Sequence, residues 1–513
     1  MNKFINKTII LALVVSIFSC TELEEDPIGL YSPDLFFKTT ADIETAVLGA
    51  YAHIANEQFY GRKLVLSLLL RGDMADIGDR NTPGRRQQVN DFDMDSNNGM
   101  ITAFWPRAYR IIGAANAGLK GVEVIGETSE KISELEGEAL FLRAFTYYHL
   151  VRIFGDIPYI ETFIENPDDV ADISKTSASE VYDNIIADLQ FAKNNLPDSY
   201  PNDVRSRPTK GTAAAYLASV HLTQGNHQQA YDEAKWVIDN KDQFGYALEE
   251  NFADLYNAEI ADELIEHIFS VDFKGQVNSG NENTDWMAPI TGIRSVFLPG
   301  INEGWSVAVP TLEVFTTWDD RDYRREVSFI DSAYLDEDLT ELFGYDKFAP
   351  NHGSARPHIG KYWRNAGNHR GDGGYSDNNY SAMRYAEVLL IAAEALNEIN
   401  SGPNAEAEGY VNEIRQRARN WNGTMTSFPE DVTSGMNQAD FQDLLIEERR
   451  LELAFEFKRW YDIKRLQIGE AVFTEPGSLE PHPKFDPDRD YLFPLPEDEL
   501  LRNENLLPQN TGY

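Results

Sequence analysis

The stretch EALFLRAFTYYHLVRIFGDIPY, from Glu138 to Tyr159, decides the architecture of this chain. Its apolar side chains recur at helical spacing and cover most of the helix surface: Leu140, Phe141, Leu142, Ala144, Phe145, Tyr147, Tyr148, Leu150, Val151 and Phe154. A helix that is apolar nearly all round is buried by its neighbours. Gly155 stands where a C-cap is expected, and Pro158 prevents continuation. The sequence therefore predicts a central, buried scaffold helix that carries no catalytic residues.

Other amphipathic segments flank this helix, and most of them form pairs. Helical periodicity is present at residues 39–60, 104–124, 177–196, 209–240 and 385–418. Residues 209–240 have small and apolar residues at the positions where the tetratricopeptide pattern requires them. This pattern forms two helices joined by a turn. Each such pair needs stacked neighbours to bury its apolar face. We therefore expect a mostly α-helical fold, with tetratricopeptide-like helix-turn-helix pairs in a right-handed superhelical scaffold. Three pairs are clear, and residues 104–124 with a neighbour would supply a fourth.

A long interruption separates the last two pairs, at residues 242–380. It has little helical period and many Gly, Asn and Asp residues, but it is rich in Trp, Tyr and Phe. An irregular segment of this length is normally functional or disordered, and its aromatic content argues against disorder. We expect an ordered insertion packed on the helical scaffold. After the last pair, one long helix is expected from Leu445 to Arg465, followed by a proline-rich tail.

The N-terminus resembles a bacterial lipoprotein leader. Lys3 and Lys7 precede an apolar run that is too short to span a bilayer, and Cys20, the single cysteine of the chain, follows it directly. We expect acylation of Cys20, with a chance cysteine or plain secretion as alternatives. The acidic stretch TELEEDP after Cys20 indicates a solvated tether or an export signal. Five parts are thus predicted: a leader at 1–19, a tether at 20–38, a helical part at 39–241, the insertion at 242–380 and a C-terminal part at 381–513.

Composition and motifs exclude several function classes. The formal net charge of -39 argues against nucleic acid as a partner and against adhesion to anionic lipid. We find no phosphate-binding loop, zinc-protease motif, nucleophile elbow or dinucleotide fingerprint. Asp91, Asp93 and Asp95 begin like a calcium loop, but Ser96 and Thr102 replace the glycine and the glutamate that it requires. No enzyme activity, cofactor or metal is therefore predicted. The run Glu448-Arg449-Arg450 is expected to form ion pairs that lock helices together.

The aromatic residues of the insertion are the best functional feature. Trp286, Trp305 and Trp318 can supply flat faces for the C–H surfaces of sugar rings, while Asp, Asn and Arg side chains bridge the hydroxyls. The alternative is that these tryptophans form the core of the insertion. We expect at least one or two of them to face solvent.

Four dispersed segments together resemble one family. They are EALFLRAFTYYHLVRIFGDIPY, RYAEVLLIAAEALNE (384–398), IEERRLELAFEFKRWYDIKR (446–465) and the closing YLFPLPEDELLRNENLLPQNTGY (491–513). The chain is similar, from Cys20 to its last residue, to the SusD/RagB outer-membrane lipoproteins of Bacteroidetes. The similarity is weakest at 242–380.

This resemblance implies a non-enzymatic nutrient-binding lipoprotein, which captures a glycan for a SusC-like TonB-dependent transporter in the outer membrane. It also implies a shallow ligand site between the loop after the first helix and the insertion. Chemistry and location within these segments, but no family motif, select the expected ligand-binding residues: Asp73, Asp76, Trp286, Trp305, Trp318 and Arg364. Peptide in place of glycan, a surface glycosidase and a pure interaction scaffold remain alternatives.

Overall fold

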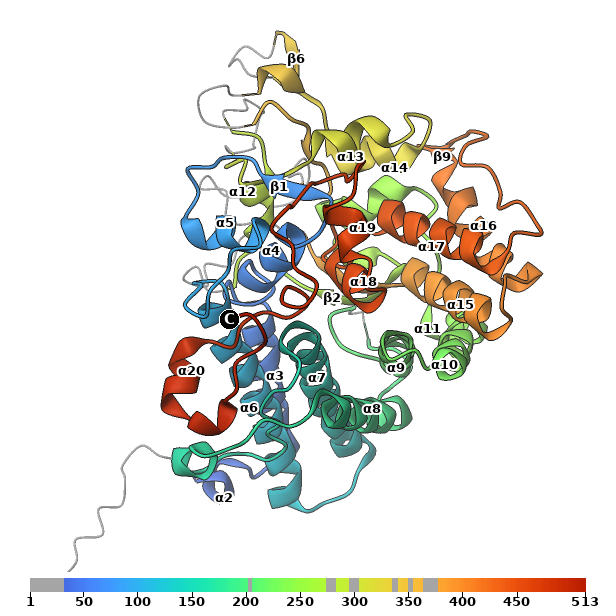
Figure 1. Cartoon of the computed structure of the whole chain (residues 1–513). Coiled ribbons are helices and arrows are strands. Elements are labelled where there is room, and N and C mark those ends of the chain that lie inside the picture. Colours follow the sequence, from blue (N-terminus) through green and yellow to red (C-terminus); the bar gives the residue numbers. More distant parts are fainter. Residues whose placement is uncertain are drawn as a thin grey trace, which may run out of the picture.

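The computed structural model describes residues 32–201, 205–273, 283–294, 304–334, 340–348, 354–362 and 377–513. Helices dominate this part of the chain, and its strands form two-stranded pairs (Figure 1). The main helices are α2 (Pro33–Phe36), α3 (Thr40–Ile54), α4 (Lys63–Leu70), α5 (Gly84–Asn90), α6 (Ile101–Ile125), α7 (Glu130–Phe154), α8 (Ala178–Asn195), α9 (Lys210–Thr223), α10 (His227–Asp239), α15 (Tyr385–Ile399), α16 (Ala405–Ala418), α17 (Gln438–Glu452), α18 (Arg459–Arg465), α19 (Gly469–Phe473) and α20 (Glu497–Arg502). None of the described helices is long and apolar enough to cross a membrane.

The scaffold consists of four helix pairs. Helix α3 packs against α6, α7 against α8, α9 against α10, and α15 against α16. Neighbouring pairs touch through α6 and α7, α8 and α9, and α10 and α15, so the pairs follow one another along a curved array (Figure 1). The mostly helical, tetratricopeptide-like fold is thereby confirmed, and α3 is the partner of the predicted helix 104–124. The right-handed sense of the superhelix stays a prediction.

Helix α7 is the buried centre that its sequence predicts. The hydroxyl of Ser129 caps its first turn by accepting from the Ile132 amide at 3.2 Å. Gly155 ends it with φ of 76°, a conformation that glycine adopts without steric cost. The polar side chains of α7 find partners inside the protein. Arg143, for example, donates two hydrogen bonds to the Asp188 carboxylate of α8, at 2.7 and 2.8 Å. The helix is thus held on all sides.

The single long helix expected from Leu445 to Arg465 is wrong. Helix α17 ends at Glu452 and α18 begins at Arg459. Between them Phe455 and Phe457 adopt left-handed φ angles of 63° and 64°, which an α-helix does not tolerate. Because of this break, both phenylalanines are buried in the core. The carboxylates of Glu452 and Glu456 both contact Arg384.

The polar segment after α4 is more ordered than the loop that the sequence suggests. It contains the strand β1 (Ala75–Ile77) and the short helix α5. Strand β1 pairs antiparallel with β3 (Ala308–Pro310), so this segment is joined to the insertion by backbone hydrogen bonds. The insertion and the N-terminal part therefore share one structural unit at this end of the molecule.

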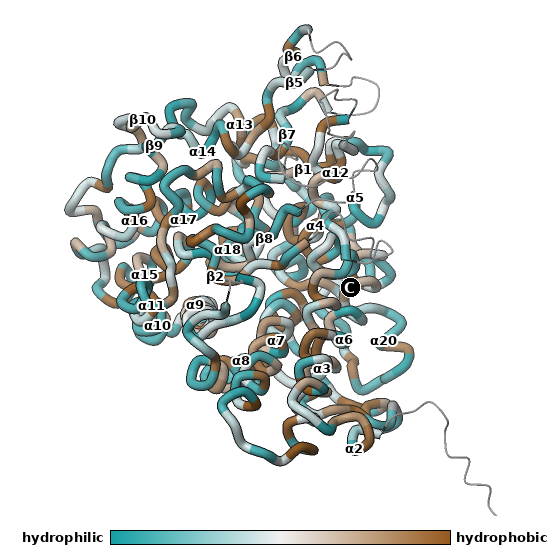
Figure 2. Tube along the Cα trace, turned by 180° about the vertical axis from the view of Figure 1, so that it is seen from behind, coloured by the Kyte–Doolittle hydropathy of each residue, from teal (hydrophilic) through white to brown (hydrophobic). Residues whose placement is uncertain are grey.

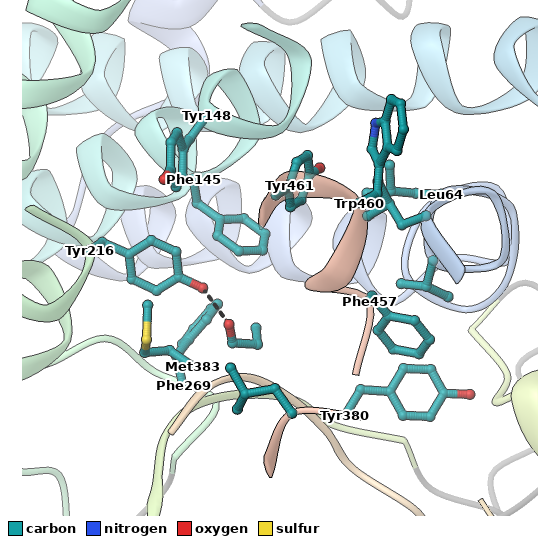
Figure 3. Packing of buried hydrophobic residues seen from close by; sticks show 14 of the residues in the cluster. Leu64, Phe145, Tyr148, Tyr216, Phe269, Tyr380, Met383, Phe457, Trp460 and Tyr461 are labelled. Carbon is teal, nitrogen blue, oxygen red and sulfur yellow. Dashed lines mark hydrogen bonds between the residues drawn. The ribbon is translucent and has the colours of Figure 1, made fainter. Parts of the chain in front are cut away.

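The insertion is packed on the scaffold, as expected. It also contains α11 (Lys241–Phe244), α12 (Met287–Thr291), α13 (Leu312–Thr317), α14 (Tyr323–Ser328), β2 (His267–Val271), β4 (Phe329–Ile330), β5 (Ser332–Tyr334), β6 (Leu342–Gly344) and β7 (His358–Ile359). Strand β2 pairs with β8 (Tyr380–Arg384), which leads directly into α15. Phe269 of β2 packs on Phe145 of α7 (Figure 3), with ring centroids 5.4 Å apart. It also packs on Phe141 of the same helix, at 5.1 Å. Aromatic packing therefore couples the insertion to the central helix.

A buried ion network makes a second connection. Five cations meet five carboxylates: Arg324, Lys361, Arg384, Arg415 and Arg417 with Glu266, Asp322, Glu448, Glu452 and Glu456. Equal numbers of opposite charges, each with hydrogen bonds, are what a buried cluster requires. The expected ion pairs of the 448–450 run are confirmed, since Glu448 joins this network and Arg449 contacts Asp462 of α18 at 2.9 Å.

This network predicts sensitivity to acid. Burial alone would raise the pKa of Glu456, but Arg384 and Lys361 outweigh it and lower that pKa to about 2. A carboxyl with a lowered folded pKa stabilises the protein above its unfolded pKa, and this stabilisation is lost as pH falls towards 2. We expect Glu456 alone to contribute a loss of about 2 kcal/mol in the free energy of unfolding between pH 7 and pH 3. Urea unfolding at the two pH values measures it, and a Glu456→Gln variant should show a correspondingly smaller change. Equal pH dependence in both proteins would contradict this role.

Candidate functional site

Two tryptophans of the insertion face each other at the end of the molecule where α4, α5, α12 and β1 meet (Figure 1). Their ring centroids are 5.4 Å apart and the planes are tilted by 34°, and both residues are only partly buried. Trp286 precedes α12, and its amide donates to the Gly61 carbonyl at 3.1 Å. Trp305 lies opposite because its amide donates to the Pro289 carbonyl of α12. Two backbone hydrogen bonds between separate segments thus position Trp286 and Trp305 at an angle to each other.

The close approach of two of these segments requires glycine at one point. A Cβ atom on Gly304 would lie 2.1 Å from the backbone carbon of Gly292, much closer than any real contact. The two backbones therefore touch directly, and Trp305 follows at the next position. Direct main-chain contacts therefore fix the backbone positions from which the two indole side chains project.

Polar groups from β1 and its continuation border the tryptophans. The Asp79 amide donates to the Ser306 carbonyl at 2.8 Å, directly beside Trp305. The Arg294 guanidinium contacts the Asp79 carboxylate at 3.0 Å and donates to the Trp305 carbonyl at 3.1 Å. The guanidinium of Arg62 lies 5.1 Å from the Trp286 ring centroid. Aromatic faces with convergent polar groups are the usual ingredients of a small-molecule site.

Asp76 organises a neighbouring group of arginines. Its carboxylate accepts from Arg80 at 3.2 Å, from Arg356 at 2.8 Å and from the Asn90 amide at 2.9 Å. Burial and the nearby Asp76 raise the pKa of Glu480 to about 8, so Glu480 is mostly protonated at neutral pH and can donate a hydrogen bond. Arg80 is half exposed, and its guanidinium also donates to both carboxylate oxygens of Asp91 at 2.8 and 2.9 Å. Asp76 is therefore the shared hydrogen-bond acceptor of a polar group that includes Arg80, Arg356 and Asn90.

The other expected site residues are placed differently. Asp73 is 1% exposed, and both its oxygens accept from Arg459 of α18 at 2.7 Å. Trp318 is 4% exposed and packs edge-on against Phe329 at 5.4 Å. Both side chains are buried, so the expectation of an exposed indole platform at Trp318 is not met, whereas it is met in part by Trp286 and Trp305. Arg364 and Cys20 lie outside the described residues.

Three arginines beside the tryptophans and Asp76 were not selected from the sequence: Arg62, Arg294 and Arg356. Nothing in the local pattern around Arg294 or Arg356 separates them from other surface arginines. The sequence around Arg62 does carry a signal, because GRK at 61–63 places two cations before the apolar run LVLSLLL. A cation at the buried end of an apolar helix is unusual and needs a reason.

A hollow with a volume of about 840 Å³ lies elsewhere, lined by residues of α14, β4, β5 and β9 (Asn420–Trp421). Tyr323 and Trp421 pack together in its wall with ring centroids 5.4 Å apart. Of the two aromatic features, only the Trp286–Trp305 pair lies beside the loop after the first helices, so we take it as the candidate site and the hollow as its competitor.

The acidic triplet that begins like a calcium loop is used for other contacts. Asp91 pairs with Arg80 at 2.8 Å, Asp93 pairs with Lys484 at 3.1 Å, and Asp95 accepts from the Asn97 amide. Within the described ranges, no group of three or more His, Cys, Asp or Glu side chains could hold a metal ion.

Comparison with known proteins identifies the family. Residues 310–513 match the model of the SusD family, and residues 32–222 match a model described as starch-binding, associating with outer membrane. SusD-like protein P2 of Formosa agariphila is 50% identical over 509 residues, which cover 99% of each chain. SusD-like protein P25 of the same organism is 29% identical over the full length of both chains. The chain therefore belongs to the SusD family.

Solved structures of the same fold are more distant in sequence. A SusD homolog from Bacteroides thetaiotaomicron has a TM-score of 0.82 at 20% identity, covering 94% of this chain and 98% of that one. A laminarin-binding SusD-like protein has a TM-score of 0.76 at 24% identity, covering 93% and 100%. Surface glycan-binding protein A of Bacteroides thetaiotaomicron, solved with laminarihexaose, has a TM-score of 0.75 at 20% identity, covering 92% and 100%.

Proposed function

We propose that this protein is a non-enzymatic cell-surface lipoprotein that captures an oligo- or polysaccharide for import. The observation that carries the proposal is the angled Trp286–Trp305 pair, bordered by Arg62 and Arg294. Indole faces pack against the C–H faces of sugar rings, and guanidinium groups bridge hydroxyls. Two structural neighbours that bind laminarin or laminarihexaose support a carbohydrate as the ligand class.

The remaining parts of the proposal concern the cell surface. Cys20 is acylated and anchors the chain in the outer membrane, and the acidic tether after it directs the protein to the exterior. The bound glycan is passed to a SusC-like TonB-dependent transporter. The family model described as associating with outer membrane supports this location. The proposed site extends to Asp76, whose carboxylate accepts hydrogen bonds from Arg80 and Arg356.

A binding experiment tests the carbohydrate site. The protein without residues 1–20 keeps every residue that the structure describes and is applied to a glycan array. We expect a glycan to bind, and Trp305→Ala to weaken that binding by about 1–3 kcal/mol because one stacking face is lost. Isothermal titration with the identified glycan measures the change, and circular dichroism confirms that the fold is kept.

Trp421→Ala is the matched control, because Trp421 lines the competing hollow. It should leave binding unchanged. If Trp421→Ala abolishes binding and Trp305→Ala does not, the site lies in the 840 Å³ hollow instead. Release of shorter saccharides by the purified protein would show an enzyme and contradict the binding role.

A further inference from the structure

Four cationic side chains gather where α4 begins and α5 packs beside it. Arg62 and Lys63 stand at the N-terminal end of α4, and Arg85 and Arg86 lie in the first turn of α5. The positive charges of both α5 arginines contribute to lowering the pKa of Arg62 and of Lys63. Figures 1 and 2 show α4 and α5 side by side next to α12 from opposite directions. We call these four residues the cation cluster.

The cation cluster is poor in counter-charges. Glu57, which pairs with Arg62, is the one carboxylate that contacts it among the described residues. Arg86 donates to the hydroxyl of Thr82 at 2.9 Å, whereas the side chains of Lys63 and Arg85 donate to no group in the described part of the chain. The Nε atoms of Arg62 and Arg85 are buried without an acceptor. Four positive charges thus share one negative charge.

This arrangement differs from the rest of the molecule. Acidic residues outnumber Lys and Arg by 84 to 45, so most cations have carboxylates within reach. The buried Arg384 contacts three of them, Glu266, Glu452 and Glu456. Lys63 and Arg86 are also mostly buried, at 9% and 6% exposed, yet they contact none within the described ranges. Burial of unpaired charge is costly, so such a cluster needs an external anion or a functional reason.

The electrostatic effect of this crowding is visible in the pKa values of Arg62, Lys63 and Arg86. Burial first, and then the charges of Arg62, Arg85 and Arg86, lower the pKa of Lys63 to about 7. Burial, followed by the charges of Arg86 and Arg85, lowers the pKa of Arg62 to about 10. Burial and the charge of Arg85 lower the pKa of Arg86 to about 10. An anion placed among these groups would raise their lowered pKa values and relieve the repulsion. Guanidinium groups bind the planar or tetrahedral oxygens of carboxylate and sulfate through paired hydrogen bonds.

The cation cluster adjoins the candidate carbohydrate site. Arg62 belongs to both, since its guanidinium lies 5.1 Å from the Trp286 ring centroid. The backbone also joins them, through the bond from the Trp286 amide to the Gly61 carbonyl. A ligand stacked on Trp286 and Trp305 would therefore bring its substituents to the cations. Net charge of -39 repels polyanions at long range, but at physiological salt this repulsion is screened beyond about 8 Å.

We propose that the glycan is anionic, and that Arg62, Lys63 and Arg85 bind its carboxylate or sulfate-ester groups while its rings stack on Trp286 and Trp305. This inference rests on the proposed carbohydrate-binding function and narrows its ligand class. It assigns recognition of charge to the ends of α4 and α5, and recognition of the ring to the insertion.

Pairs of glycans that differ only in charge test the proposal. The protein without residues 1–20 is titrated with dextran and dextran sulfate, with chondroitin and chondroitin sulfate, and with methyl-esterified and de-esterified pectin, and inorganic sulfate is added alone in a thermal-shift assay. We expect a charged member to bind at least tenfold more tightly than its less charged counterpart. Binding of dextran sulfate or chondroitin sulfate would identify sulfate esters as the anion, and binding of de-esterified pectin would identify carboxylates.

Variants separate the cation cluster from the tryptophans. Lys63→Met and Arg85→Met remove a charge while keeping an apolar side chain of similar length, so each should lower affinity for the charged glycan at least tenfold. Because both changes also relieve repulsion in the free protein, the melting temperature should stay the same or rise, which excludes unfolding as the cause. Lys63→Arg keeps the charge and should retain binding.

The outcomes are distinguishable from failure of the proposed function. Equal binding of neutral and charged glycans, lost in Trp305→Ala, overturns the anionic ligand and leaves carbohydrate binding in place. Charged binding that survives Lys63→Met and Arg85→Met likewise overturns it. Charged binding that depends on the cations and not on Trp305 supports the anion site and contradicts the tryptophan platform. No binding by any charged glycan, with no thermal shift by sulfate, overturns the inference.

Discussion

Replacing Glu452 by Gln is expected to destabilise the protein by about 3–5 kcal/mol, one of the largest effects of any single change. Glu452 is fully buried at the end of α17. Its carboxylate contacts Arg384 at 2.6 Å, Arg324 at 3.2 Å and also Arg417. The amide of glutamine keeps the shape but removes the negative charge, which leaves the five cations of the network with four carboxylates. Urea unfolding followed by circular dichroism measures the loss.

Glu447 provides the matched control on the same helix. Its carboxylate is 51% exposed and pairs with Arg450 at 2.5 Å at the surface. Glu447→Gln should cost less than about 1 kcal/mol, because exposed ion pairs are weakened by solvent and salt. Similar losses in the two variants would contradict a special role for the buried network.

Loss of the ion network should also affect the candidate carbohydrate site, because the network joins the insertion to the C-terminal part. Arg324 and Lys361 belong to the insertion, whereas Glu448, Glu452 and Glu456 belong to the C-terminal part. The insertion carries Trp286 and Trp305, so a weakened network would loosen the support of both indoles. Glu452→Gln should therefore weaken glycan binding even though Glu452 is remote from the tryptophans in sequence and buried among arginines.

Local sequence patterns were sufficient for the helical scaffold. Apolar spacing is a property of a few adjacent residues, and α8, α9 and α10 appear at the expected positions. The break after Glu452 was not predictable in this way. The apolar pattern continues through Leu453, Phe455 and Phe457, and the left-handed φ angles there depend on distant partners such as Tyr362, whose hydroxyl donates to the Phe455 carbonyl at 2.9 Å.

The sequence shows which residue types the candidate site contains, but it does not show how each of them is surrounded in the fold. Trp286, Trp305 and Trp318 look alike in the sequence, but Trp318 is covered by Phe329 and approached by Arg450, and both contacts span the tertiary structure. Asp73 and Asp76 also look alike in the sequence. In the structure Asp73 forms an ion pair with Arg459, whereas Asp76 forms ion pairs with Arg80 and Arg356. The cation cluster combines two segments that are 22 residues apart, so only the unusual lysine at the start of α4 pointed to it.

Phe145→Ala should cost about 3–5 kcal/mol, because removing a fully buried aromatic ring loses its transfer free energy and leaves a cavity. Phe145 projects from α7 towards Tyr216 of α9 and Phe269 of β2 (Figure 3), with ring centroids 5.7 and 5.4 Å away. It also packs on Tyr60, which precedes α4, at 5.7 Å. One ring thus joins the N-terminal part, the second half of the scaffold and the insertion.

The control for this change is Phe36→Ala at the exposed end of α2, where the ring is 39% exposed and a loss below about 1 kcal/mol is expected. Because three parts of the chain share the contacts of Phe145, its removal should lower the midpoint of one common unfolding transition. Far-UV circular dichroism and tryptophan fluorescence should then report the same shifted midpoint. If the two signals separate in Phe145→Ala, or if its midpoint equals that of Phe36→Ala, the central helix does not couple the insertion to the scaffold as its packing indicates.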